Sequence, residues 1–458
     1  MANHSIRGSM MGPEEKDKKV PRGGRLRTIY PAPVGLRFSA YAAALKSLQG
    51  ELALEFFRIL RRVRAWADTS EDNRADLFEL DQRQVKEGLG RACGRVPRLV
   101  EAFGTFAQLV RAPADVAPAT VAEACAEVMD WAAEEGKLEL AVLFAEAAAT
   151  ADPLDANRAN SAGRACRWAA RMERAASWYQ RAFGLAVRAK NRQAVIDALL
   201  GYGNVLLDQD RHSEAKVYFE RAARRAATTG RLRQAGKAHH DLLSIAAEVG
   251  TLKEGYRHVV AALGYYPAGD VRLPGLAHDW GFHLVRLQLY SAAVPVLQLA
   301  SPRAPSADEE AIFLATLAWA FAGSRRREPF ETAAARCVEL LETCRQYAAG
   351  AYLHLAAGAM AFGLWKRAEE YLKEAKKAAR RRKQEALASE ADELLKLARK
   401  RELAPPEAAT IPLEGGLEAL ARVFRRLRTR IGTADAPARA RAGADASSEI
   451  ARRVRGGV

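Results

Sequence analysis

One arrangement of small and large apolar residues recurs seven times along this chain, at intervals of 34 to 40 residues. In the clearest copy it runs through Leu199, Tyr202, Gly203 and Leu206 and then Ala215, Phe219 and Ala222. A small residue at such a position lets two helices approach closely, and a helix pair of this length cannot bury its apolar face alone. Neighbouring pairs must therefore stack. We expect an all-α solenoid, a class that usually binds other molecules.

The spacing resembles the tetratricopeptide repeat, in which a Leu-Gly pair and an aromatic residue are followed by Ala, a bulky residue, Ala and Pro. The central small position falls on Ala141, Ala175, Ala215, Gly255, Ala293, Phe330 and Ala368. The closing small position follows seven residues later, on Ala148, Ala182, Ala222, Ala262, Ala300, Cys337 and Ala375. Phe330 is the poorest match. The resemblance covers residues 119–402 and implies a right-handed superhelix of about seven helix-turn-helix repeats.

Prolines, charges and helical periodicity divide the rest of the chain. Within residues 1–37, we interpret the first ten as an expression remnant that precedes a second start at Met11. The rest of this segment is expected to be a disordered leader. Residues 38–112 read as N-terminal helices, with an interruption near Gly94 and Pro97. A long charged helix, roughly 365–401, closes the array. Residues 403–432 are predicted to form a linker and an amphipathic helix, and 433–458 a flexible basic tail.

The C-terminal region carries much of the positive charge. The formal net charge of the chain is +16. From Ala421 onward ten arginines face three acidic residues, a net of +7. Within this region an apolar stripe alternates every three or four residues, at Leu417, Leu420, Phe424, Leu427 and Ile431. The stripe fits a helix that caps the solenoid, or one that docks on a partner. The charge fits a solubilising tail or a phosphate-rich partner, although the tail lacks aromatic residues for stacking on bases.

Enzymatic motifs do not occur in this sequence. It contains neither a P-loop, nor a dinucleotide fingerprint, nor His-Glu-x-x-His, and the adjacent His239 and His240 point to different sides of a helix. Five cysteines without Cys-x-x-Cys spacing are interpreted as core residues of a protein in the reducing cytoplasm. No apolar run reaches the roughly 18 residues that a membrane span needs. We therefore predict a cytoplasmic non-enzyme with no cofactor, metal or catalytic residue. The Ala- and Arg-rich composition favours a bacterial source.

The resemblance also indicates where a partner binds, because the first helix of each repeat lines the concave face in that family. The matching polar and aromatic positions are Asn157, Asn160, Arg164, Arg167, Trp168, Asn204, Asp208, Lys237, His240, His278, Phe282 and Arg286. Asparagine side chains there could bond to the backbone of an extended protein or peptide segment, and arginines could pair with its carboxylates. The ordinary alternative is a solvated polar surface. The set that clamps a C-terminal carboxylate in some members is matched only in part, by Asn204 and Lys237.

A second function, from a different class, stays open. Leu89, Cys93, Val100 and Phe103 are spaced roughly like the buried residues of a helix-turn-helix, although Arg95 falls where an apolar residue is usual. On this alternative the protein is a nucleic-acid-associated transcriptional regulator that uses residues 86–103 or the basic tail. A helical cap on the solenoid is the ordinary interpretation of the same segment.

Overall fold

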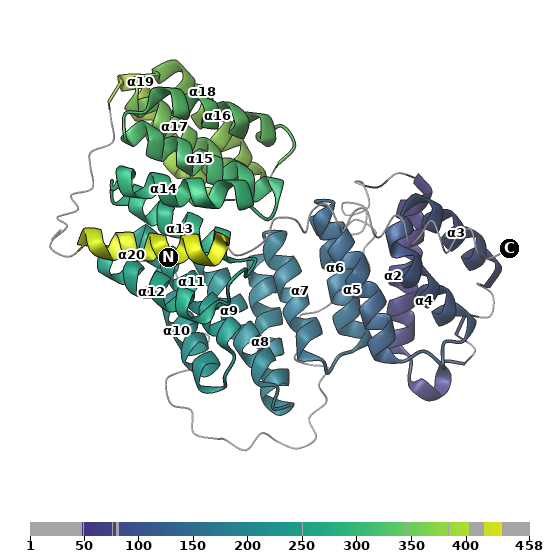
Figure 1. The fold of residues 1–458 in the computed structure, drawn as a ribbon. Coiled ribbons are helices and arrows are strands. Elements are labelled where there is room, and N and C mark those ends of the chain that lie inside the picture. Colours follow the sequence, from purple (N-terminus) through teal and green to yellow (C-terminus); the bar gives the residue numbers. More distant parts are fainter. Residues whose placement is uncertain are drawn as a thin grey trace, which may run out of the picture.

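The fold is an all-α solenoid of stacked helix pairs (Figure 1). The computed structural model describes residues 48, 50–75, 77–78, 82–249, 251–344, 346–382, 384–402 and 416–432, and within these ranges every regular element is a helix. The leader expected at 1–37 and the tail expected at 433–458 lie outside them. The seven pairs are α5–α6 (Pro118–Glu134, Leu138–Ala151), α7–α8 (Ala156–Trp168, Met172–Arg188), α9–α10 (Arg192–Leu207, His212–Thr228), α11–α12 (Leu232–Val249, Leu252–Tyr265), α13–α14 (Leu273–Arg286, Tyr290–Ala300), α15–α16 (Ala307–Gly323, Arg327–Leu341) and α17–α18 (Ala348–Ala361, Trp365–Arg381).

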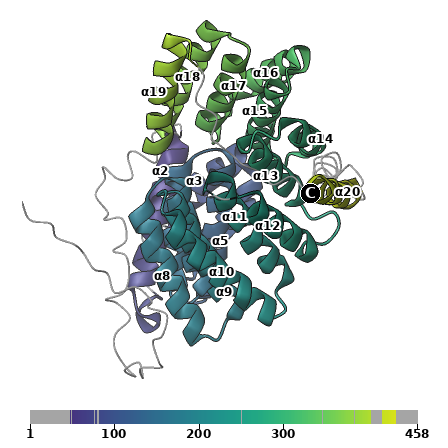
Figure 2. The same ribbon diagram turned by 90° about the vertical axis from the view of Figure 1, so that its left-hand side faces the viewer.

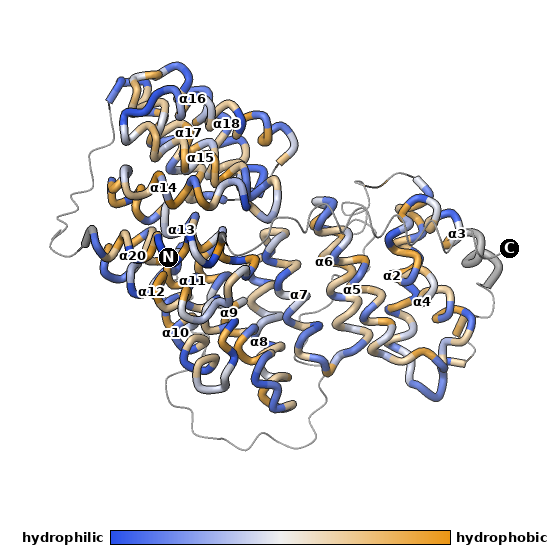
Figure 3. The backbone as a smooth tube through the Cα atoms, in the orientation of Figure 1, coloured by the Kyte–Doolittle hydropathy of each residue, from blue (hydrophilic) through white to orange (hydrophobic). Residues whose placement is uncertain are grey.

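The predicted repeat register is visible in the core. All seven central positions and all seven closing positions are buried. A Cβ atom added at Gly203 would lie 2.6 Å from the Phe219 ring, so only glycine allows α9 and α10 to cross there. The bulky Phe330 fits because Gly358 lies opposite, where an added Cβ would meet its ring at 2.7 Å. Figure 3 shows hydrophobic residues recurring along the stacked helices.

Tight turns with one left-handed residue connect most of these helices. Gly136, Gly230 and Gly363 have positive φ, but so do Ala170 and Lys190. After each such residue the next amide closes back onto the carbonyl five positions earlier, as from Arg171 to Cys166 at 2.8 Å. This closure satisfies carbonyls that a helix end leaves free. It accounts for turns that the sequence marks with no glycine.

The first helices of neighbouring repeats form the inner layer. They pack against one another across repeats, with α7 on α9, α11 on α13 and α15 on α17. Elements that lie closer together define the concave side of a superhelix. Side chains on the exposed side of the first helices therefore face a shared groove.

The N-terminal helices cover the first repeat. They are α2 (Gly50–Asp68), α3 (Gln82–Arg95) and α4 (Val100–Arg111), with a 3₁₀ turn at Pro97–Leu99 between the last two. The Phe56 ring lies 5.6 Å from Trp131 and 5.4 Å from Phe144, measured between centroids. These contacts join α2 to both helices of the first pair and close that end of the apolar core.

The C-terminal end differs from the sequence prediction. One long helix over 365–401 is wrong: α18 ends at Arg381 and a separate helix, α19 (Glu385–Lys400), folds back onto it. The Gln384 amide bonds to the Ala379 carbonyl at 3.0 Å, which is the same five-residue closure as in the other turns. Because neither glycine nor proline is needed for that closure, the break is not visible in the sequence. It is α19 that covers the last repeat.

The amphipathic helix α20 (Gly416–Gly432) does not cap the end of the solenoid. It reaches back to lie against α12, α13 and α14, as both Figure 1 and Figure 2 show. Its buried residues are Leu420, Val423, Leu427 and Ile431, whereas Phe424 is only half-buried. The Gly269 amide donates to the Arg430 carbonyl at 3.1 Å, and the Arg430 guanidinium donates to the Tyr266 carbonyl at 2.5 Å. Helix α20 lies there because the loop after α12 separates the fourth and fifth pairs and leaves an apolar surface between them.

Candidate functional site

A polar pocket of about 350 Å³ opens between the first helices of the second, third and fourth pairs. It brings together four of the predicted residues, Asn157, Asn160, Arg164 and Lys237. The other lining residues are Ser161, Tyr179, Asp197, Gly201, Arg233, Gln234 and Arg272. Four cationic side chains thus face one carboxylate. The pocket is suited to an anionic group.

Two of these cations are available to a ligand. Neither Arg164 nor Lys237 forms an ion pair with any residue that the structure describes, and the Arg164 guanidinium lies 5.3 Å from the Trp168 ring. By contrast Arg233 binds the buried carboxylate of Asp270 at 2.8 Å. The amide nitrogen of Asn160 donates to the Ala194 carbonyl at 3.1 Å, while its buried oxygen has no hydrogen-bond partner. Arg164 and Lys237 therefore carry charge outside ion pairs, although Asp130 lies within electrostatic range of the first and Asp241 of the second.

Tyr179 lines this pocket although it belongs to a second helix, α8. Its ring passes between α7 and α9 where two glycines make room: an added Cβ would lie 3.0 Å from the ring at Gly163 and 2.0 Å at Gly201. Burial raises the pKa of Tyr179 to about 12, against the opposing effect of the nearby Arg167 and Arg164 guanidinium groups. Sequence analysis missed this residue, as it missed Arg233 and Arg272. Gly163 and Gly201 are the sequence feature that could have indicated the position of the Tyr179 ring.

The polar groups of other predicted residues bind to one another or to neighbouring helices within the wall of the groove. The Arg167 guanidinium binds the Asp208 carboxylate at 3.1 Å, which joins α7 to the end of α9. The Asn204 amide donates to the Leu200 carbonyl at 2.9 Å and lies 3.4 Å from the Asp241 carboxylate. Burial raises the pKa of Asp208, and Arg167 opposes that rise. This part of the wall is a structural network between repeats.

A chain of hydrogen bonds links the first helices of the fourth to seventh pairs. Asp279 binds His240 at 3.0 Å and the neighbouring His278 at 2.9 Å. The other ring nitrogen of His278 lies 3.0 Å from the Thr316 hydroxyl, which lies 3.0 Å from His354. Burial opposes ionisation of Asp279, but the two histidines outweigh it and hold its pKa below the ordinary value. Asp279, Thr316 and His354 were missed by sequence analysis.

Aromatic rings cluster in the C-terminal half of the same inner layer. The Phe282 ring stacks on His354 at 5.1 Å, and Trp319 lies 5.3 Å from His354, measured between centroids. His278 stacks on Phe313 at 4.3 Å. Phe282, Trp319 and His354 are all partly exposed. We call these three residues the aromatic platform, and it offers apolar surface to a partner.

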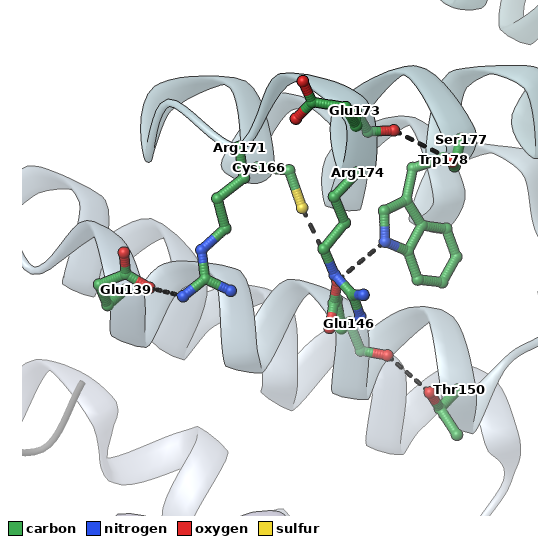
Figure 4. A network of polar contacts seen from close by, with 9 residues as sticks. All are labelled: Glu139, Glu146, Thr150, Cys166, Arg171, Glu173, Arg174, Ser177 and Trp178. Atoms are coloured by element: carbon green, nitrogen blue, oxygen red, sulfur yellow. Dashed lines mark hydrogen bonds and ion pairs between the residues drawn. The ribbon is translucent and has the colours of Figure 1, made fainter. Parts of the chain in front are cut away.

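The outer layer holds the second and first repeats together behind the pocket. In Figure 4 the buried carboxylate of Glu146, on α6, accepts two bonds from Arg174 on α8. It also accepts a bond from the Trp178 indole at 2.9 Å, and the Cys166 thiol lies 3.7 Å from it. Burial is the main cause that raises the pKa of Cys166. This network is structural and joins α6 to α7 and α8.

In the segment considered for DNA binding, residues 86–103, Leu89 and Phe103 are buried. Its arginines Arg91, Arg95 and Arg98 are exposed. They form ion pairs with Glu51 and Glu134. Among the described residues no group of histidine, cysteine and acidic side chains is arranged as a metal site. None of the described helices is long and apolar enough to cross a membrane.

Comparisons with known proteins give structural likenesses only. No family model and no curated protein matches the chain. A solved Rap protein in complex with Competence and Sporulation Factor is 11% identical with a TM-score of 0.43, over 77% of this chain and 98% of that one. The Rap conjugation gene regulator of plasmid pLS20 in complex with the Phr* peptide is 14% identical with a TM-score of 0.48, over 72% of this chain and 97% of that one. The Cut9–Hcn1 hetero-tetramer of APC/C is 14% identical with a TM-score of 0.45, over 80% of this chain and 64% of that one. A likeness at this level says nothing about function.

Proposed function

We propose that this protein is a non-enzymatic scaffold or sensor that binds an extended segment of a protein or peptide in its concave groove. The observation that carries the proposal is the cationic pocket, because Arg164 and Lys237 there have no ion-pair partner among the described residues. An anionic side chain or terminus of the segment would bind them. The exposed Asn157 supplies an amide group for its backbone.

The aromatic platform supplies the second half of the proposed site. It lies on α13, α15 and α17, whereas the pocket lies on α7, α9 and α11. A segment that follows the groove from one to the other would place an apolar or aromatic side chain on Phe282 and Trp319, where burial stabilises binding. Binding of this kind uses no chemical step.

Charge reversal in the pocket tests the proposal. A 12-residue peptide selected from a random display library on the intact protein would be labelled, and its affinity measured by fluorescence anisotropy. Arg164→Glu with Lys237→Glu should weaken binding at least tenfold, because both cations are lost and two repulsive charges appear. Arg167 is left unchanged, since its reversal would break the pair with Asp208.

The matched control reverses two exposed cations of α8 and its turn, Arg188→Glu and Lys190→Glu, which lie outside the pocket. This variant should bind like the unmodified protein. All three proteins should give the same helical circular dichroism spectrum. Equal affinities for the pocket variant and the control would contradict the proposed site.

A further inference from the structure

Helix α20 has two faces with different roles. Leu420, Val423, Leu427 and Ile431 are buried against the fourth and fifth pairs. The outward side carries three arginines, Arg422, Arg425 and Arg426, all partly or fully exposed. Because the apolar stripe is already covered within the chain, a partner can reach only the arginine face.

The surrounding helices do not neutralise this face. Among the described residues, α14 carries no acidic side chain, and Glu418 is the only acid of α20 itself. Each acid on α12, α13 and the loop between them has another partner. These pairs are Glu254 with Lys216 at 3.1 Å, Asp270 with Arg233 at 2.8 Å and Asp279 with His240 at 3.0 Å.

The arginines themselves are correspondingly unpaired. Arg422, Arg425, Arg426 and Arg428 form no ion pair with any part of the chain that the structure describes. Arg430 differs, because its guanidinium bonds to the Tyr266 carbonyl and anchors the helix. One arginine thus holds α20 in its seat, and the others carry uncompensated charge on a rigid, docked surface.

We propose that the outward face of α20 binds the phosphate backbone of double-stranded DNA. Arginine suits this role because its planar fork donates two bonds to one phosphate, and the helix uses no lysine in its place. Residues three or four apart on a helix rise by about 4.5–6 Å, so successive arginines can reach successive phosphates of one strand. This proposal is independent of the groove.

The composition of the face defines the kind of nucleic acid. The outward side presents no aromatic ring, since Phe424 is half-buried on the flank of the seat. Single-stranded nucleic acid is usually held by stacking on such rings. The face should therefore bind a duplex through its backbone, with no preference for base sequence. A membrane surface is a poorer fit, because the apolar side chains that would insert are buried within the fold.

The test measures binding of the full chain to a labelled 20-base-pair duplex of mixed sequence between 50 and 200 mM salt. Arg422→Ala with Arg425→Ala and Arg426→Ala should reduce affinity at 100 mM salt by about tenfold or more. It should also lower the slope of log affinity against log salt by about 2.7, which is three phosphate contacts at about 0.9 each. A second duplex of unrelated sequence should give the same values.

A matched variant removes the same charge elsewhere: Arg188→Ala with Arg224→Ala and Arg225→Ala, three exposed arginines of α8 and α10. This variant should keep both affinity and slope. The proposal is overturned if the two variants lose affinity equally, since net charge would then be the cause. It is also overturned if the α20 variant binds the duplex like the unmodified chain, or if the chain binds vesicles with 30% phosphatidylserine and not the duplex.

Discussion

Glu146 is a buried carboxylate of the outer layer. It accepts bonds from Arg174 and from the Trp178 indole, and so joins the first repeat to the second. A second pair, Glu139 with Arg171, joins the same two helices but is partly exposed to solvent. Glu146 accepts two bonds from Arg174 and Glu139 accepts one from Arg171, and the two carboxylates also differ in burial.

Replacing Glu146 with alanine should lower the free energy of unfolding by about 3 kcal/mol, because the partly buried Arg174 guanidinium and the buried Trp178 indole N–H lose their acceptor. Glu139→Ala should lower it by at most about 1 kcal/mol, because water replaces the carboxylate at a half-exposed site. Urea titrations of both variants measure the difference. Equal losses would mean that burial of Glu146 does not matter.

Protonation of buried histidines should make stability depend on pH. Burial lowers the pKa of His283, which has no exposed surface, to about 4. The unfolded chain binds this proton at about pH 6.5, so the unfolded state takes up more protons between pH 6.5 and 4. His283 therefore contributes stability above pH 6.5 that is lost as the pH falls. Between pH 7.5 and 5 the loss should be about 2 kcal/mol.

Comparing His283→Gln with the unmodified protein at both pH values isolates this effect. Glutamine does not titrate, so the variant should lose about 2 kcal/mol less on acidification, whatever its stability at pH 7.5. His258, whose pKa burial also lowers to about 4, remains in both proteins and serves as an internal background. The same loss in both proteins would place the pH dependence elsewhere.

At the scale of the helices, the crossing of α9 and α10 depends on Ala215. This residue has no exposed surface, and the crossing is also narrowed by Gly203 against the Phe219 ring. Ala215→Trp should destabilise the third pair by on the order of 1–3 kcal/mol or more, since overpacking forces the two helices apart. Thermal unfolding followed by circular dichroism measures this loss. An unchanged melting temperature would contradict the repeat register.

Helix α20 is held by its apolar stripe, so a single charge in the seat should release it. Leu427 has no exposed surface. Leu427→Asp should undock α20 while the stacked pairs stay folded, because a lone buried carboxylate costs more than the helix gains. Limited proteolysis should then cut α20 early, at a concentration that leaves the unmodified chain intact. Thr429→Asp, at an exposed position of the same helix, is the comparison and should have a smaller effect.

At the scale of the whole molecule, the buried residues form two large clusters. One extends from α2 into α11, and the other from α11 to α20. In a solenoid each repeat contacts only its neighbours, so a local defect should not spread through the entire chain. The two clusters meet in α11, where Leu242 belongs to the first and Leu243 to the second.

Hydrogen exchange on Ala215→Trp tests this division. Amides of the third pair and its neighbours should exchange faster, because their opening requires less free energy. Amides of α15 and α17, which belong to the other cluster, should keep their protection. Uniform acceleration across all seven pairs would show that the solenoid unfolds as one cooperative unit.

The sequence by itself determined the helix pairs and their register, because small residues at each crossing recur with a fixed local spacing. It also placed Asn160, Arg164 and Lys237 on first helices, from which they reach one pocket. Only the tertiary structure decided that Tyr179 enters this pocket from behind and that α20 folds back onto the fifth pair. Those contacts join residues far apart in the chain. They depend on the curvature accumulated over several repeats and on the gap after α12, and neither leaves a periodic signal in the sequence.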